Sequence, residues 1–249
     1  MPQGPGVALI DTHAHLNELE DPEGALARAR EAGLTGIVAV GMDLAANRVN
    51  LELARRFPDL VYPAIGYHPW ALDPKQTEEN LAFIREHLPG CVALGEVGLD
   101  YQAKTKKKVQ QQVFAALLEI AVQHRRPVLI HTRFSQHRAQ AMVKEAGIEK
   151  AVFHWYSGPL EVLEKILADG YFISATPALT YSPPHQAAVA AAPLSQILLE
   201  TDAPVEYQGK VSEPADLIWT AREVSRVKGV PLKEVIRITT ANAREFFGI

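Results

Sequence analysis

The sequence has almost no cysteine, no long apolar run and no large excess of either charge. A single cysteine, Cys91, stands among 249 residues, so the chain can form neither an internal disulfide nor a zinc site built from thiolates. No stretch approaches the ~18 consecutive apolar residues of a transmembrane helix. The start of the chain, MPQGPG, lacks the basic residues and apolar run of a signal peptide. We therefore expect a cytoplasmic protein that binds no membrane.

The charge balance is close to neutral. Lysine and arginine number 25 and aspartate and glutamate 29, a formal net charge of −4. This balance argues against a protein that coats nucleic acid through bulk charge, although it leaves room for a local basic site. Hydrophobic residues make up 47% and charged residues 22%, as in an ordinary globular protein. The length fits one domain over residues 1–249, and no sequence feature indicates an oligomeric state.

Short apolar runs recur along the chain, and each is nearly continuous in apolar residues, which is typical of parallel strands buried on both faces. The eight runs are Val7–Ile10, Gly36–Val40, Val61–Ile65, Cys91–Leu94, Pro127–Ile130, Ala151–Phe153, Tyr171–Ser174 and Ile197–Leu199. Helical patterns separate most of them, at Pro22–Ala32, Asn47–Phe57, Thr77–Leu88, Val109–Arg125, Ser135–Ala146 and Pro159–Ala168. Two or three further helices are expected between Glu213 and Ile249.

This alternation predicts an α/β fold, a single-domain (β/α)₈ TIM barrel. The alternative is an open doubly wound sheet, which would place a glycine-rich phosphate turn after the first strand. The sequence there is Asp-Thr-His-Ala-His instead, which favours the barrel.

Metal-binding residue types follow five of the predicted strands. They are His13 and His15 after the first strand, Glu96 after the fourth, His131 after the fifth, His154 after the sixth and Asp202 after the eighth. The carboxyl ends of barrel strands converge on one mouth, where the active site of such a barrel lies. The HxH spacing also puts both imidazoles on one side of an extended chain. We therefore expect these six side chains to form one metal centre.

Six ligands are too many for one tetrahedral zinc ion and suit two ions bridged by a carboxylate. We assign His13, His15 and Asp202 to one ion and His131 and His154 to the other, with Glu96 bridging. Two such ions activate a water for a displacement reaction, and Asp202 can also accept its proton. Four imidazoles favour Zn²⁺, Mn²⁺ or Fe²⁺ over Mg²⁺.

Other polar residues near these positions have two explanations each. Asp11 can orient a ligand or simply end the first strand. Gly95 and Gly98 can let the backbone pass close to the ions, or can belong to a plain turn. The remaining histidines are interpreted as solvated or structural: His87, His124, His137 and His185.

The strand-end motifs DTHAHL, GYHP, GEVGLD, IHTR, HWYSG and ETDAP, in this order, resemble the TatD family of metal-dependent hydrolases, which belongs to the amidohydrolase-like barrels. The resemblance extends from Asp11 to the closing TTANAREFFG. It implies a divalent-metal-dependent phosphodiesterase of the deoxyribonuclease type, with DNA or another phosphodiester as substrate, a use of Mg²⁺, and the same six ligands. It adds His68 and Arg133 as residues near the substrate.

The chain departs from the family in the loops of the mouth. Phe134 and Ser135 stand where the family usually has an acid, and Tyr156 replaces a phenylalanine. The segments Gln102–Lys108 and Ala203–Ser212 also diverge. Because these loops form the mouth, they bear on the identity of the substrate rather than on the metal centre.

Two residues of the mouth are interpreted as substrate contacts. We favour a substrate or phosphate contact for His68 over a seventh ligand or a structural role. Arg133 lies two residues past His131, and its guanidinium suits a phosphate oxygen, although a structural salt bridge is the alternative.

A lysine-rich run and several aromatic residues also follow strands. The run Lys104–Lys108 is either a solvated helix start or a local attraction for a nucleic-acid backbone. The aromatic residues Trp70, Tyr101, Trp155 and Tyr156 can stack on bases or pack at the rim.

Three functions remain to be compared. The first is a two-metal phosphodiesterase, and the second is an amidohydrolase acting on a small amide, lactone or amine on the same barrel. Many such amidohydrolases bridge their metals with a carboxylated lysine at the fourth strand, where this chain has Glu96, so the first function is favoured. A non-catalytic metal-binding scaffold has no support, because a structural site leaves no open coordination position.

Overall fold

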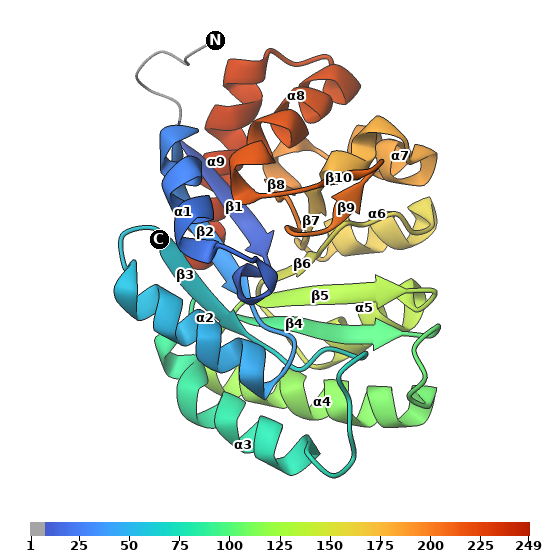
Figure 1. The fold of residues 1–249 in the computed structure, drawn as a ribbon. Coiled ribbons are helices and arrows are strands. Elements are labelled where there is room, and N and C mark those ends of the chain that lie inside the picture. Colours follow the sequence, from blue (N-terminus) through green and yellow to red (C-terminus); the bar gives the residue numbers. More distant parts are fainter. Residues whose placement is uncertain (1–7) are drawn as a thin grey trace.

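The computed structural model describes residues 8–249 and contains the predicted barrel (Figure 1). Its eight parallel strands pair in sequence order: β1 (Leu9–Ala14), β2 (Leu34–Val40), β3 (Val61–Ile65), β4 (Ala93–Asp100), β5 (Val128–Arg133), β6 (Ala151–Phe153), β7 (Phe172–Ala175) and β8 (Ile197–Leu199). A parallel bridge between Ala14 and Ala203 joins β1 to the chain just after β8 and closes the sheet. Val7 and the MPQGPG start lie outside the described residues.

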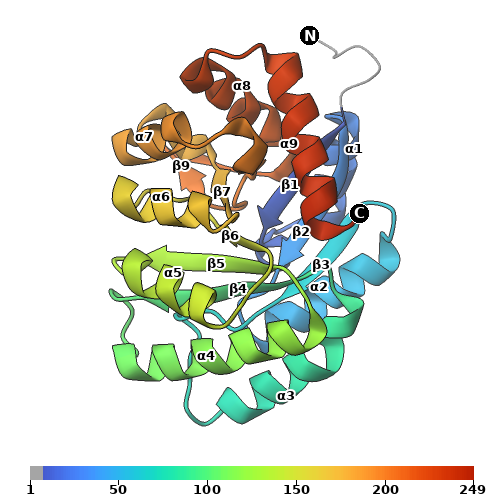
Figure 2. The same cartoon turned by 180° about the vertical axis from the view of Figure 1, so that it is seen from behind.

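The helices lie outside the sheet and connect the strands (Figures 1 and 2). They are α1 (Pro22–Glu31), α2 (Leu44–Arg56), α3 (Thr77–His87), α4 (Lys107–His124), α5 (Gln136–Glu145), α6 (Leu160–Ala168), α7 (Pro183–Ala191), α8 (Leu217–Lys228) and α9 (Leu232–Phe247). The sequence did not predict α7, a nine-residue helix of mostly small residues whose apolar face is weakly marked. Among residues 8–249, no helix combines the length and apolar character needed to cross a bilayer.

Side chains alternate between the inside of the barrel and the helices. Leu129 and Val152 belong to a buried cluster inside the barrel, whereas their neighbours Ile130 and Phe153 pack in the cluster beneath the helices. His131 and His154 lie two residues beyond Leu129 and Val152, and residues two apart on a strand share a face. The same alternation that builds the core therefore directs both histidines into the mouth.

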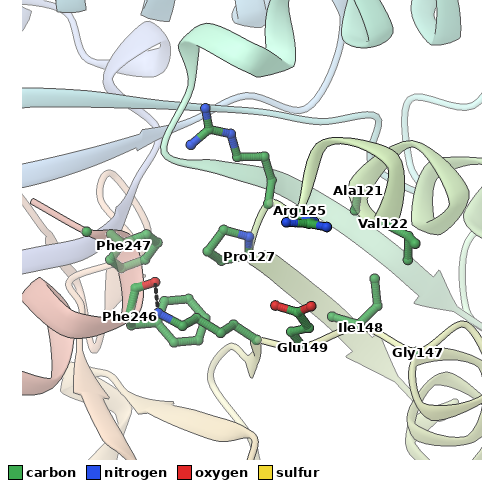
Figure 3. A pocket seen from close by; sticks show the side chains of 12 residues that line it. Ala121, Val122, Arg125, Pro127, Gly147, Ile148, Glu149, Phe246 and Phe247 are labelled. Carbon is green, nitrogen blue, oxygen red and sulfur yellow. Dashed lines mark hydrogen bonds between the residues drawn. The ribbon is translucent and has the colours of Figure 1, made fainter.

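Helix α9 covers the opposite end of the barrel. Phe246 packs against Phe172, the first residue of β7, with ring centroids 5.2 Å apart. Figure 2 shows α9 running beside β1 to the C-terminus. A hollow of about 290 Å³ lies next to this end of α9, where the amino group of Lys150 faces the Phe246 carbonyl at 3.5 Å (Figure 3). The other residues that line this hollow lie at the end of α4 and in the segments before β5 and β6, so it lies away from the predicted metal centre.

Strands β1, β4 and β5 extend further than the sequence predicted. Their polar ends, including His13, Glu96 and His131, continue the strands instead of following them. Apolar content alone could not detect this extension. The pairing of β4 with β5 shifts register between Leu94 and Val97, and that of β1 with β2 shifts between Asp11 and Ala14. Such irregularities re-aim side chains, and both coincide with predicted ligands.

The glycines around Glu96 serve strand packing. A Cβ on Gly98, whose φ is +148°, would collide with the His131 carbonyl oxygen. A Cβ on Gly95 would meet the Leu129 side chain at 2.7 Å. These contacts are with the neighbouring strand, so close strand packing, and not a turn, explains both glycines.

Candidate metal centre

The six predicted ligands meet at the carboxyl ends of the strands, and all are buried or nearly buried. His13 in β1 and His15 directly after it have their Nε2 atoms 3.3 Å apart. The Nδ1 atom of His15 lies 3.1 Å from the Val40 carbonyl oxygen. A carbonyl can only accept, so Nδ1 carries a proton and Nε2 is the ring nitrogen that faces the cluster.

Asp202 completes the first group of ligands. Its Oδ1 atom lies 3.4 Å from His15 Nε2 and 3.6 Å from His13 Nε2. Burial acts to raise the pKa of Asp202, but the imidazoles of His15 and His13 outweigh it and lower the pKa to about 2. Asp202 has a φ of +52°, a conformation that aspartate tolerates better than most residues. Its amide donates to the His13 carbonyl at 3.0 Å, which holds the β8 end against β1.

Glu96 lies between two groups of histidines. Its Oε2 atom faces His13 and His15, at 3.4 and 3.6 Å from their Nε2 atoms. Its Oε1 atom faces His131 Nδ1 at 2.9 Å and His154 Nε2 at 2.8 Å. Burial acts to raise the pKa of Glu96, but the surrounding imidazoles outweigh it and hold the pKa well below its usual value. Each of the two histidine groups thus faces a different oxygen of the Glu96 carboxylate.

Two carboxylates that were not predicted as site residues lie behind the second group. Asp100 Oδ2 lies 3.3 Å from His131 Nε2, and Glu200 Oε1 lies 3.4 Å from His154 Nδ1. Carboxylates in such positions orient metal-binding imidazoles and raise their basicity. Both residues belong to the motifs GEVGLD and ETDAP, and an acid at the end of an apolar strand was the signal that could have identified them.

His68 also reaches the cluster, with its Nε2 atom 3.4 Å from Glu96 Oε1. The backbone amide of Trp70 donates to His68 Nδ1 at 3.2 Å. Burial lowers the pKa of His68 to about 4, so the ring is neutral and its single proton lies on Nε2. An Nε2–H group donates hydrogen bonds and does not bind a cation. This arrangement supports the interpretation of His68 as a donor to an anion rather than a seventh ligand.

Arg133 lies at the rim of a cavity of about 500 Å³ that the metal-centre residues line. It is exposed and forms no ion pair with any residue between 8 and 249, so the salt-bridge alternative has no support there. Asp11, by contrast, is fully buried and accepts hydrogen bonds from the amides of His13 and Thr201. It therefore connects β1 to the end of β8 and contacts no ligand ring.

The other candidates from the sequence lie outside the cluster. The remaining histidines occupy structural or surface positions, such as His185, which is buried and bonded to the Tyr156 carbonyl. Tyr156 itself is buried and donates to the Pro159 carbonyl, so it packs and cannot stack on a base. Trp70 and Trp155 line the cavity.

Comparison with known proteins identifies the family. The family described as TatD related DNase matches residues 10–248. The chain belongs to this family. It is 32% identical to the "Uncharacterized metal-dependent hydrolase YabD" of Bacillus subtilis, covering 97% of this chain and 99% of that protein. It is 31% identical to "Deoxyribonuclease TATDN3" of Homo sapiens, covering 97% of this chain and 95% of that protein. The crystal structure of YJJV, a TatD homologue from Escherichia coli, superposes with a TM-score of 0.88 at 27% identity, covering 97% of this chain and 98% of that one.

The residues present fit the metal dependence of TatD proteins. Two overlapping groups of predicted ligands have side-chain nitrogen and oxygen atoms within 4.8 Å of one another: His13, His15 and Asp202; His13, Glu96 and His154. A third such group, His68, Glu96 and His131, includes His68, which is interpreted above as a donor. Asp202 Oδ1 is buried without a hydrogen bond from any described residue. A buried carboxylate oxygen that lacks a donor is costly unless a cation satisfies it.

Loss of either histidine of the second group should lower metal content without unfolding the chain. We expect His131→Ala and His154→Ala each to lose about one bound ion per chain, because each removes a ligand from the same position. His87→Ala is the matched control, since the His87 side chain bonds to the Phe83 carbonyl on its own helix and belongs to none of the ligand groups. Elemental analysis after dialysis, with thermal melting by circular dichroism, measures both properties. Unchanged metal content in both variants would contradict the assignment.

Proposed function

We propose that residues 1–249 form a single hydrolase domain that cleaves phosphodiester bonds, with DNA as the favoured substrate, at a centre of two divalent cations. The observation that carries this proposal is the position of Glu96, whose two oxygens face separate groups of imidazoles. The deoxyribonuclease name of a relative at 31% identity supports the substrate class. We also propose a cytoplasmic location, which stays a prediction from the sequence.

The proposed ligands divide between two positions. His13, His15 and Asp202 would hold one cation and His131 and His154 the other, with Glu96 shared by the two groups of residues. Cations held there supply Lewis acidity toward water and toward the phosphodiester oxygens. The donor set of four imidazoles and two carboxylates suits Zn²⁺, Mn²⁺ or Fe²⁺ better than Mg²⁺.

The residues of the chain perform the remaining steps. Asp202 is ionised and accepts the proton of the attacking water through a carboxylate oxygen. The Nε2–H of His68 donates a hydrogen bond to a phosphate oxygen, because its neutral tautomer is fixed by the Trp70 amide. Arg133 offers its guanidinium fork to a second phosphate oxygen from the rim of the cavity.

A substrate panel tests the proposed function. The wild-type protein, loaded in turn with Mg²⁺, Mn²⁺ and Zn²⁺, should hydrolyse bis-p-nitrophenyl phosphate and oligodeoxynucleotides. It should leave a set of small amides and lactones intact. Asp202→Asn, prepared in parallel, excludes a contaminating nuclease. Preferential turnover of an amide or lactone would show an amidohydrolase on the same barrel.

Arg133→Ala tests the phosphate contact. We expect kcat/KM for phosphodiesters to fall roughly tenfold to a thousandfold, because a charge-assisted hydrogen bond is worth a few kcal/mol. Metal content should stay normal, and Arg133→Lys should restore activity in part, since a point charge cannot replace a bidentate fork. Arg138→Ala is the control, because Arg138 is exposed on α5 and pairs with Glu145. An unchanged rate in Arg133→Ala would assign Arg133 a structural role.

A further inference from the structure

Four lysines gather beside the mouth in a chain whose net charge is negative. Lys104, Lys106, Lys107 and Lys108 are all exposed, on the segment that connects β4 to α4 and on the first turn of α4. None of the four forms an ion pair with a carboxylate between residues 8 and 249. Lys107 is engaged in part, because its amino group lies 4.4 Å from the centroid of the Tyr101 ring. The other three amino groups face solvent.

Helix stability does not explain these lysines. The amino end of a helix carries partial positive charge, so cations in the first turn disfavour the helix. The first turn of α4 contains no acid, and the side chain of Lys106 forms no capping hydrogen bond. The positive charge at this position therefore does not stabilise the helix.

The lysine segment is fixed next to the metal centre. Buried Gln110 holds the loop between Asp100 and Thr105, because the Gln110 side chain bonds to the amide and carbonyl of Asp100 and to the Thr105 carbonyl. The Tyr101 amide donates to the Arg133 carbonyl at 2.9 Å, so the segment starts beside the proposed phosphate contact. In Figure 1 the segment lies at the arrowhead ends of β4 and β5.

Two exposed aromatic side chains lie on the same side of the mouth. Phe134 directly follows Arg133, is 66% exposed and has a φ of +53°. A phenylalanine in the left-handed region is strained, and its exposed ring gains nothing from burial, so folding does not account for it. Trp70 is 61% exposed, and its indole N–H donates to Asp100 Oδ2 at 2.6 Å, which holds the ring at the rim.

We propose that these residues form a basic–aromatic strip that binds several consecutive nucleotides of a polynucleotide strand beside the scissile phosphodiester. The strip is defined as Trp70, Lys104, Lys106, Lys107, Lys108 and Phe134. Its lysines bind phosphates, and its two rings stack on bases, a combination typical of sequence-tolerant nucleic-acid grooves. The inference rests on the proposed function and adds which residues of this chain hold the strand on one side of the scissile phosphodiester. An acidic peptide would use the lysines and leave the aromatic rings unused.

Binding to fluorescein-labelled oligothymidylate, followed by fluorescence anisotropy in EDTA over a range of salt concentrations, tests the strip without turnover. Lys104→Gln/Lys106→Gln should weaken binding about tenfold at low salt, and the slope of log affinity against log salt should become shallower by about 1.4, at ~0.7 for each lost phosphate contact. Phe134→Ala should weaken binding about tenfold without changing the slope, because stacking releases no counterions.

Matched controls separate the strip from general charge. Lys144→Gln/Lys165→Gln removes the same charge from the last turns of α5 and α6, and Trp219→Ala removes an exposed aromatic ring from α8. Neither control should weaken binding. Equal weakening of oligothymidylate binding in these controls would overturn the strip. An oligoglutamate peptide that binds the wild type as tightly as oligothymidylate, and whose binding is weakened equally in the lysine variant, would also overturn it.

Turnover completes the test and separates it from the proposed function. In the wild type, kcat/KM should rise with oligonucleotide length over the first few nucleotides, and both strip variants should flatten this rise. Hydrolysis of bis-p-nitrophenyl phosphate should stay unchanged in both. A parallel loss of activity on this small substrate would show that the variants disturb the metal centre and would overturn the strip. A wild type that binds oligothymidylate through the strip but hydrolyses no phosphodiester would overturn the proposed function and leave the strip in place.

Discussion

Glu96→Gln should abolish nearly all phosphodiesterase activity while the barrel stays folded. Each of its carboxylate oxygens faces a different group of imidazoles, so a neutral amide removes the charge that offsets the repulsion of two dications. Outer-shell residues of metal sites already contribute about 10- to 100-fold, and loss of a shared ligand should exceed this, to about a thousandfold or more. Steady-state kinetics and elemental analysis on the same preparation measure the effect.

The metal-free protein offers a second readout for Glu96. Burial acts to lower the pKa of His154, but the negative charges of Glu96 and Glu200 outweigh it and raise the pKa well above its usual value. Glu96→Gln should therefore lower this pKa, which NMR titration of the metal-free protein can follow. Glu164→Gln, on the exposed face of α6, should change neither the phosphodiesterase activity nor the pKa of His154. Near-normal turnover with two bound ions in Glu96→Gln would show that Glu96 does not bridge.

Asp202→Asn should separate metal binding from proton transfer. Asparagine is nearly isosteric and still offers an oxygen, so most of the metal should remain. An amide cannot act as a base near neutral pH, so turnover should fall by about two to four orders of magnitude, the usual contribution of general base catalysis. Metal analysis, substrate binding and the pH–rate profile of the variant measure these properties together.

The pH–rate profile carries the decisive comparison for Asp202. In the wild type, the acidic limb reports the coupled ionisation of Asp202 and the attacking water rather than that of one residue. Asp100→Asn is a matched control, because it removes a buried carboxylate that contacts His131 and not the first group. We expect it to weaken metal binding and to keep the acidic limb in place. Substantial activity of Asp202→Asn with an unshifted acidic limb would leave Asp202 a ligand at most.

The order of elements and the place of the proposed ligands could be derived from the sequence. Buried parallel strands require continuous apolar runs, and strand ends in a barrel converge, so His13, Glu96 and Asp202 could be assigned to one mouth from local pattern alone. The strand boundaries could not be derived from the sequence, because the polar ends of β1, β4 and β5 are extended by pairing with neighbouring strands. Helix α7 escaped prediction because a short helix of small residues carries little periodic signal.

The chemistry of each ring depended on contacts that the sequence does not encode locally. The tautomer of His68 is set by the Trp70 amide, and the orientation of His131 by Asp100 on a neighbouring strand. Glu96 lies within the register shift of β4, and its two oxygens face separate groups of imidazoles. These features arise when five strands bring their ends together, since the donor or acceptor that lies opposite a ring nitrogen decides whether that nitrogen carries a proton. The sequence by itself determined that the six proposed ligands meet at one end of the barrel, and only the tertiary structure showed that Asp100 and Glu200 lie behind them and which atoms face one another.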